Sequence, residues 1–189
     1  MLNEHLDKAV SKLREIFDVN KRQRQFQNMD VFSLVVPESK IPEWFNHQSE
    51  GCSITVERPP YIYNKGKFVG YVVCSVFALP KHPPLSNSQY HWGHLISCTV
   101  NVDFYFGPDP CIRFKKEFAE VVSHHLWILY FPRHHQKLKK SNRSKHDRVG
   151  FGFNTSPGLE MKRCGFCPIY ENDVKEFYKI TSSNHDFGI

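Results

Sequence analysis

The alternation of hydrophobic and polar positions predicts short β-strands over most of the chain. Val31 to Val36 is a β-branched and aromatic run that stops at Pro37, which cannot donate a ladder hydrogen bond. Beyond Gly51, apolar Cys52, Ile54 and Val56 alternate with polar residues. Further runs typical of strands cover 68–78, 95–106, 125–131, 149–153 and 160–170, with Gly and Pro turns between them. This spacing predicts an all-β fold, an antiparallel β-sandwich or jelly roll.

Two of these runs predict strands that are buried to different extents. Residues 68–78 are apolar almost throughout, which indicates a strand that is central in a sheet or covered on both faces. Residues 95–106 alternate, with Ser97, Thr99 and Asn101 on the polar side, so this strand should have one wet face. Residues 114–123 are compatible with a strand or a short helix.

The connection between the first two predicted strands is unusually apolar. Ile41, Trp44 and Phe45 fall three or four residues apart around Pro42, a residue that suits the first position of a short helical turn. We expect strand, tight turn and strand, with Trp44 and Phe45 forming a plug over one open end of the β-core. An aromatic turn on the surface is the alternative, although large exposed apolar patches are uncommon on monomeric domains.

Helical periodicity occurs near the amino terminus. The apolar residues of this segment recur at helical spacing and predict one amphipathic helix from about Asn3 to Asp18: Leu2, Leu6, Ala9, Val10, Leu13, Ile16 and Phe17. Its apolar stripe needs a partner, within this domain or outside it. We expect a helix and polar linker over 1–28, a β-sandwich domain over 29–180 and a tail over 181–189.

Composition supports a folded domain. The 189 residues are 40% hydrophobic and include 16 Phe, 8 Tyr and 3 Trp. No apolar run approaches the ~20 residues that span a bilayer, and the amino terminus does not resemble a signal peptide. Six cysteines are too sparse for a disulfide scaffold, and we expect Cys52, Cys74 and Cys98 to be buried reduced thiols.

The positive charge is concentrated in one predicted loop. Residues 133–148 contain seven Lys or Arg and one Asp, which equals the whole net charge of +6. A nucleic-acid or phosphate-binding role for this basic loop is the alternative function. It is disfavoured because aromatic residues do not alternate with the charges, as they do in many single-strand binding grooves.

Catalytic and metal-binding patterns are weak. The chain lacks a Gly-x-Ser-x-Gly elbow, a phosphate-cradling Gly-Lys-Ser/Thr loop and a His-Glu-x-x-His helix. Cys164 and Cys167 form a Cys-x-x-Cys, but on a strand they point to opposite faces, as the adjacent histidines of 124–125 also do. Zinc or redox chemistry would require a turn or a helix start there, so structural cysteines are the preferred interpretation, with no catalytic residue, metal or cofactor.

A rigid β scaffold that carries long loops is typical of recognition without catalysis. We expect the aromatic and basic residues of three loops to form the partner-binding surface: Tyr61, Tyr63, Tyr90, Trp92, Arg133 and Lys137.

Several blocks resemble one known family. Residues 35–56, with the segment Ile-Pro-Glu-Trp-Phe-x-His-Gln-Ser, are similar to the opening of the post-LRR domain of plant TIR-NBS-LRR immune receptors, also called the C-terminal jelly-roll/Ig-like domain (C-JID). Residues 67–71, 125–130, 149–153 and 162–171 resemble its later blocks, in order. Six residues of these blocks stand out as structural motif positions: Pro42, Trp44, Phe45, Trp127, Cys164 and Gly165.

The resemblance implies a non-enzymatic recognition module of an intracellular plant receptor, in the cytoplasm or nucleus. Its implied partners are a pathogen effector protein and the leucine-rich repeats of the same receptor, without a membrane. NAD cleavage belongs to the TIR domain of such receptors and to none of these residues. The resemblance carries over no effector contacts, because those lie in loops outside the shared blocks.

Overall fold

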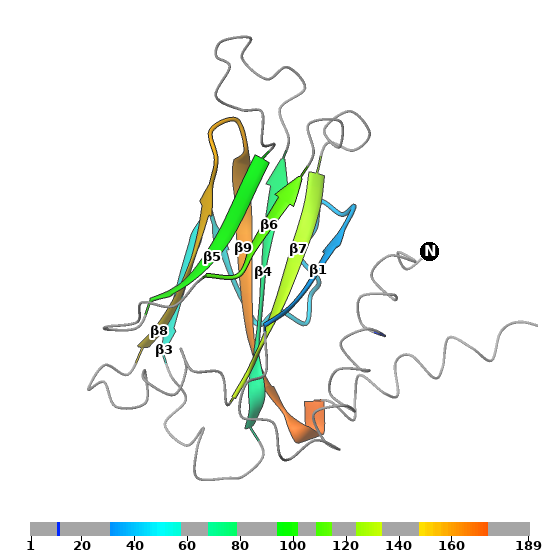
Figure 1. Ribbon diagram of the computed structural model, residues 1–189. Coiled ribbons are helices and arrows are strands. Elements are labelled where there is room, and N and C mark those ends of the chain that lie inside the picture. Colours follow the sequence, from blue (N-terminus) through cyan, green and yellow to red (C-terminus); the bar gives the residue numbers. More distant parts are fainter. Residues whose placement is uncertain are drawn as a thin grey trace, which may run out of the picture.

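Two antiparallel sheets form the protein (Figure 1). The computed structural model describes residues 31–57, 68–78, 94–101, 109–114, 124–133 and 148–173, together with Ser11. Their strands are β1 (Phe32–Val36), β2 (His47–Glu50), β3 (Ser53–Glu57), β4 (Phe68–Ala78), β5 (His94–Asn101), β6 (Cys111–Phe114), β7 (His124–Pro132), β8 (Arg148–Thr155) and β9 (Glu160–Tyr170). The five-stranded sheet has the order β1-β7-β4-β9-β2, and the four-stranded sheet has the order β3-β8-β5-β6.

The pairing of these strands follows a simple rule. β5 pairs with β6, β4 with β7, β3 with β8 and β2 with β9, all antiparallel. The chain from β2 to β9 is therefore one long hairpin whose successive pairs alternate between the two sheets, which is the arrangement of a jelly roll. β1 adds a fifth strand beside β7. The predicted all-β antiparallel sandwich is confirmed.

The core between the sheets comes from alternate residues of facing strands. It is rich in aromatic rings: Phe68, Tyr71, Phe77, Trp127, Phe131, Phe151, Phe153 and Phe166. The rings of Phe131 and Phe151 join β7 to β8 with centroids 5.4 Å apart, and Trp127 meets Phe153 edge-on at 6.0 Å. These contacts bury large apolar surfaces from both sheets and hold the layers together.

The two contrasting strand predictions are also confirmed. β4 lies between β7 and β9, and nine of its eleven residues are buried, as its apolar run indicated. In β5, Ile96 and Cys98 are buried, whereas Ser97 and Thr99 on the other face are only partly covered. β6 and the polar strand β2 were not predicted.

The first predicted unit, however, is not a hairpin. β1 and β2 lie at opposite edges of the five-stranded sheet, so residues 37–46 must cross three intervening strands. At ~4.8 Å per strand the crossing is about 19 Å, which this segment spans easily when extended. We call residues 37–46 the strap.

The strap packs on the outer face of the five-stranded sheet and does not plug an end of the sandwich, so the expected plug is wrong. Ile41 and Phe45 belong to a second apolar cluster, separate from the core between the sheets, with Val72 and Leu126 of the sheet below. Phe45 is 2% exposed, whereas Trp44 is only half-buried and stacks on Phe45 with centroids 4.1 Å apart. The Phe45 N–H donates to the Pro42 carbonyl (3.1 Å), which closes a tight turn in the strap.

Gly165 of β9 explains how the strap comes so close. A Cβ at this position would stand 2.9 Å from Cys74 Sγ, 3.1 Å from Ile41 Cγ2 and 3.2 Å from Phe45 Cδ1. The missing side chain therefore lets the strap lie directly on the sheet.

The chain passes from one sheet to the other between β2 and β3. Gly51 turns with φ of +86°, a value that L side chains rarely adopt, and its N–H donates to the Lys162 carbonyl (2.9 Å). Cys52 follows before β3 begins, and it is exposed. The expectation that Cys52 is buried is therefore wrong, because the alternation of β3 starts only at Ser53. Cys74 and Cys98 are buried as predicted.

Several predictions concern segments outside the described residues. These are the helix 3–18, the linker to residue 28, the last part of the predicted strand 95–106 (102–106), all of 115–123 and the tail 181–189. Ser11, described singly, is helical and exposed.

Candidate partner-binding ends of the sandwich

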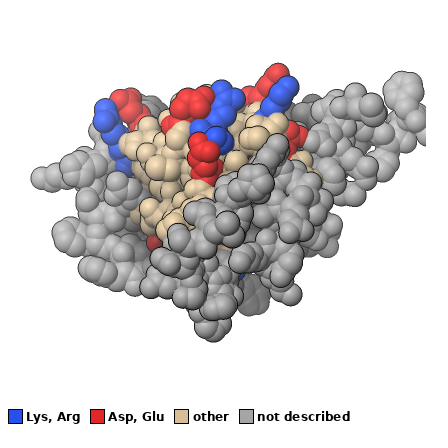
Figure 2. Space-filling model, turned by 90° about the horizontal axis from the view of Figure 1, so that it is seen from above, with Lys and Arg blue, Asp and Glu red and all other residues tan. Residues whose placement is uncertain are grey.

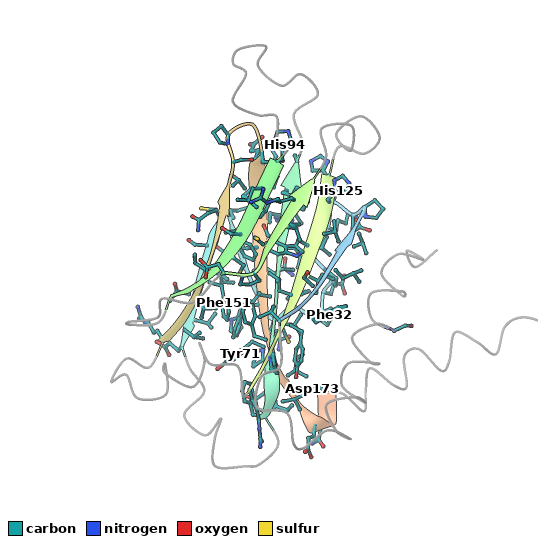
Figure 3. The ribbon with its side chains drawn as sticks, viewed as in Figure 1. Phe32, Tyr71, His94, His125, Phe151 and Asp173 are labelled. Atoms are coloured by element: carbon teal, nitrogen blue, oxygen red, sulfur yellow. The ribbon has the colours of Figure 1, made fainter. Side chains whose placement is uncertain are left out.

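The direction of each strand assigns the loop attachment points to two ends of the sandwich. We call one the basic end, marked by Glu57, Phe68, Asn101, Arg133 and Arg148. The other is the histidine end, marked by Ala78, His94, Phe114, His124 and Thr155. In Figure 3, His94 and His125 both lie at the histidine end, and Tyr71 lies toward the basic end.

The ends are far apart. β4 runs from one to the other over 11 residues, which at 3.3 Å per residue is about 36 Å. Segments attached at different ends therefore leave the sandwich at points about 36 Å apart.

The predicted partner-binding residues divide between these ends. Tyr61, Tyr63, Tyr90, Trp92 and Lys137 lie outside the described residues, and Arg133 is described. The flanking strands attach the segments 58–67 and 134–147 at the basic end, and 79–93 at the histidine end.

Two tyrosines therefore share an attachment point with the basic loop, whereas Tyr90 and Trp92 belong to a loop attached at the far end. Sequence patterns carry no signal for this division, because it follows from pairing between strands that are distant in the chain.

Exposed charges mark the basic end. Arg133 is exposed, and its backbone N–H donates to the Val69 carbonyl (3.0 Å), which fixes the start of the basic loop to β4. Arg148, where that loop rejoins the sheet, lies 3.9 Å from the Glu57 carboxylate. Both side chains of this pair are largely exposed, so it contributes little to stability and leaves the arginine accessible.

Beneath the basic end the core is a stack of aromatic rings. Phe151 lies 5.4 Å from Phe131 and 5.5 Å from Phe166, whose ring is 5.1 Å from Tyr71. Since buried rings pack closely and resist rearrangement, the loop attachment points at this end sit on a rigid base.

Charges elsewhere on the described surface are mixed. Figure 2 shows acidic and basic side chains interspersed along one rim. Among the described residues, opposite charges pair at Arg163–Glu50 (2.9 Å) and Lys162–Glu160 (2.6 Å). This rim has no large area of one sign, so it offers no strong field for steering a charged partner.

The histidine end carries described side chains of both charge signs, because exposed Arg113 lies opposite Leu95 and exposed Glu160 opposite Ala78. The buried His125 ring stacks on Phe77 with centroids 5.4 Å apart and an interplanar angle of 17°. Burial lowers the pKa of His125, and the neighbouring His124 lowers it further. His125 is therefore neutral at pH 7 and acts as a packing residue.

The Cys-x-x-Cys divides between the two faces of the five-stranded sheet. Cys164 belongs to the core between the sheets and Cys167 to the cluster under the strap, as their spacing predicted. Burial raises the pKa of each to about 11, and burial also raises the pKa of Cys74. Protonated thiols on opposite faces form neither a shared metal site nor a reactive redox pair.

Three other residues of the family motif are buried in the described structure, which fits a structural role. Pro42 and Gly165 are buried with the strap, and Trp127 is fully buried between the sheets. Within the described ranges, no three His, Cys, Asp or Glu side chains are grouped so that they could hold a metal ion. No described helix has the length and apolar character needed to cross a membrane.

The C-JID domain model matches residues 36–175, most of the chain, and the chain belongs to this family, the C-terminal jelly-roll/Ig-like domain of plant TIR-NBS-LRR immune receptors. A search of curated proteins gives no match. The resemblance noted in the sequence is confirmed, and the family is generally a non-catalytic receptor module.

Proposed function

We propose that this domain is a non-enzymatic recognition module of an intracellular plant immune receptor, in the cytoplasm or nucleus. It contributes to sensing of a pathogen effector protein and to control of receptor activation. The observation that carries the proposal is the two-sheet scaffold of a C-JID domain, whose strands attach the connecting segments 58–67 and 134–147 at one end and 79–93 at the other. Rigid scaffolds with long loops are typical of recognition sites.

The separation of the ends refines this proposal. A standard protein interface buries ~800 Å² on each partner, a patch about 32 Å across. Because the ends are about 36 Å apart and face away from each other, one compact effector contacts one end only. The other end remains accessible to the leucine-rich repeats of the same receptor.

The basic end is the better candidate for the effector. Its attachment points carry exposed Arg133 and Arg148. Tyr61 and Tyr63 belong to the segment 58–67, which is attached at the same end as the basic loop. Tyrosine and arginine are enriched in the energetically dominant parts of protein interfaces, so an acidic effector surface suits this end.

Paired substitutions in the receptor that carries this domain test the proposal. Tyr61→Ser with Tyr63→Ser changes the basic end, and Tyr90→Ser with Trp92→Ser is the matched change at the histidine end. We expect the first pair to lower effector-triggered cell death at least tenfold while receptor accumulation is unchanged. Equal responses from both pairs and the unaltered receptor would refute recognition through these loops.

A second candidate function is nucleic-acid or phosphate binding through residues 133–148. It is favoured by the shared attachment of this loop and the tyrosine-bearing 58–67 loop, which supplies the aromatic residues that the basic loop lacks. A salt titration of single-stranded DNA binding tests it. Affinity that falls steeply with salt, and is lost when Lys137, Lys139, Lys140 and Arg143 are neutralised together, supports this function. Absence of binding at low salt excludes it.

A further inference from the structure

The outer face of the five-stranded sheet is apolar well beyond the strap. The cluster on this face includes Val72, Ile128, Tyr130 and Ile169, each at most 1% exposed. A sheet face that is exposed to water normally carries polar side chains. This face is therefore built to be covered.

The strap accounts for part of that cover. It leaves β1 at Val36, opposite Leu126 near the histidine end, and touches β9 at Gly165. Phe32 and Leu34 of β1 point to the same outer face but remain half-buried. In Figure 3, Phe32 lies on the edge strand, nearer to the basic end. Val69 of β4, one strand beyond β7, is also only partly buried on this face. A partly exposed apolar patch thus remains at this edge of the sheet, and we call Phe32, Leu34 and Val69 the β1 patch.

β1 is also an unusually bare edge strand. Its sequence, Phe-Ser-Leu-Val-Val, has no charge and no internal proline, the usual protections of a sheet edge. Among the described residues it pairs only with β7. Proteins commonly shield such an edge with a helix or a loop.

We propose that residues 3–18 of this chain dock as an amphipathic helix on the β1 patch. Their apolar stripe centres on Leu6 and Leu13. An amphipathic helix of this kind needs an apolar surface on which to bury that stripe. Ser11 is helical and exposed, and on a helical wheel it lies opposite that stripe. Its exposure therefore agrees with a stripe that faces the sheet.

The position and length of the segment support the same occupant. Residues 19–30 link it to Val31, the residue directly before β1. The intervening residues 19–30 reach about 40 Å when extended, twice the ~19 Å width of the sheet. A 16-residue helix is about 24 Å long, close to the ~30 Å of β7. A tether of this length raises the effective concentration of the segment to the millimolar range.

Docking of this segment does not depend on the proposed function, and it identifies an interaction surface of the domain. It would also hold β1 in place and protect the bare edge from pairing with other chains.

Hydrogen exchange of the full 189-residue chain tests the proposal. Leu6→Gln with Leu13→Gln removes two side chains from the apolar stripe. Lys8→Gln with Glu15→Gln is the control on the polar face, and it leaves the net charge unchanged. Glutamine keeps the helix propensity in both variants.

We expect the stripe variant to exchange the β1 amides at least tenfold faster than the unaltered chain, and the control to differ less than twofold. Unaltered β1 exchange in the stripe variant would overturn the proposal. Two other results would also overturn it. Protection of β1 that rises with protein concentration would assign the patch to a second copy. If the β1 amides instead lose their exchange protection in a Phe177→Gln with Tyr178→Gln variant, and keep it in the stripe variant, the patch would be covered by the carboxy-terminal segment.

Discussion

Gly165 offers a direct test of the strap, because a single methyl group added there would collide with it. Gly165→Ala places a Cβ 2.9 Å from Cys74 Sγ, 3.1 Å from Ile41 Cγ2 and 3.2 Å from Phe45 Cδ1. Gly165 has no left-handed backbone, so alanine fits its backbone and the cost is steric. Contacts this short from three sides require the strap or β4 to shift.

Overpacking of this kind costs about 1–3 kcal/mol. For a domain of this size, each kcal/mol lowers Tm by about 2–4 °C, so we expect a fall of about 2–12 °C. Chemical denaturation and thermal unfolding measure both quantities. Trp44 stacks on Phe45 at 4.1 Å, so its fluorescence reports whether the strap has lifted.

A matched glycine in the other sheet serves as the control. A Cβ at Gly152 would meet only Thr99 Oγ1 at 2.9 Å, the end of a side chain on the outer face of β5. The Thr99 hydroxyl donates to the Gly152 carbonyl (3.1 Å), so a rotation that relieves this contact loses that hydrogen bond. Gly152→Ala should therefore cost about 1 kcal/mol and leave the strap in place. Ile41→Ala combined with Gly165→Ala should be less destabilising than the sum of the single changes. Equal stability of Gly165→Ala and the unaltered protein would refute close packing of the strap.

Four further predictions follow from burial. Phe45→Ala should cost about 3–5 kcal/mol and Trp44→Ala clearly less, because only Phe45 is fully buried; urea unfolding of both variants decides the order. Trp127→Phe should cost less than about 2 kcal/mol, because the buried Nε1 of Trp127 has no hydrogen-bond partner among the described residues; calorimetry that gives more than 3 kcal/mol would contradict this. In the folded state, only Cys52 and Cys111 of the six described cysteines should react quickly with a thiol reagent. The two buried thiols of β9 have a pKa of about 11, above the 9.0 of a free thiol, so the unfolded chain ionises first. Stability should be fully present below pH 9 and decline between pH 9 and 11, and a constant unfolding midpoint across that range would contradict the assignment.

Local patterns predicted the elements whose surroundings are strongly one-sided. The apolar run of β4 and the alternation in β5 identified a central strand and a half-wet strand, and both are confirmed. β2 was missed because it is a polar edge strand in which only Ser49 is partly covered, so it carries no hydrophobic signal. The strap was misjudged for another reason. A short apolar connection looks the same whether its flanking strands pair with each other or lie at opposite edges of a sheet, and only long-range pairing decides between them.

The candidate site shows the same limit. The sequence identified aromatic and basic loop residues, and family blocks identified the domain. It could not divide those residues between the basic end and the histidine end, since that division depends on how β4, β7 and β8 run relative to one another.

The central claim is that this domain recognises an effector through loops at one end of a rigid sandwich. The most direct measurement is effector-triggered cell death in leaves that express the receptor with either the Tyr61→Ser and Tyr63→Ser pair or the Tyr90→Ser and Trp92→Ser pair. Immunoblots of receptor accumulation accompany each variant. The account predicts that the first pair lowers the response at least tenfold and the second preserves it, with equal accumulation. A full response from both variants would contradict it.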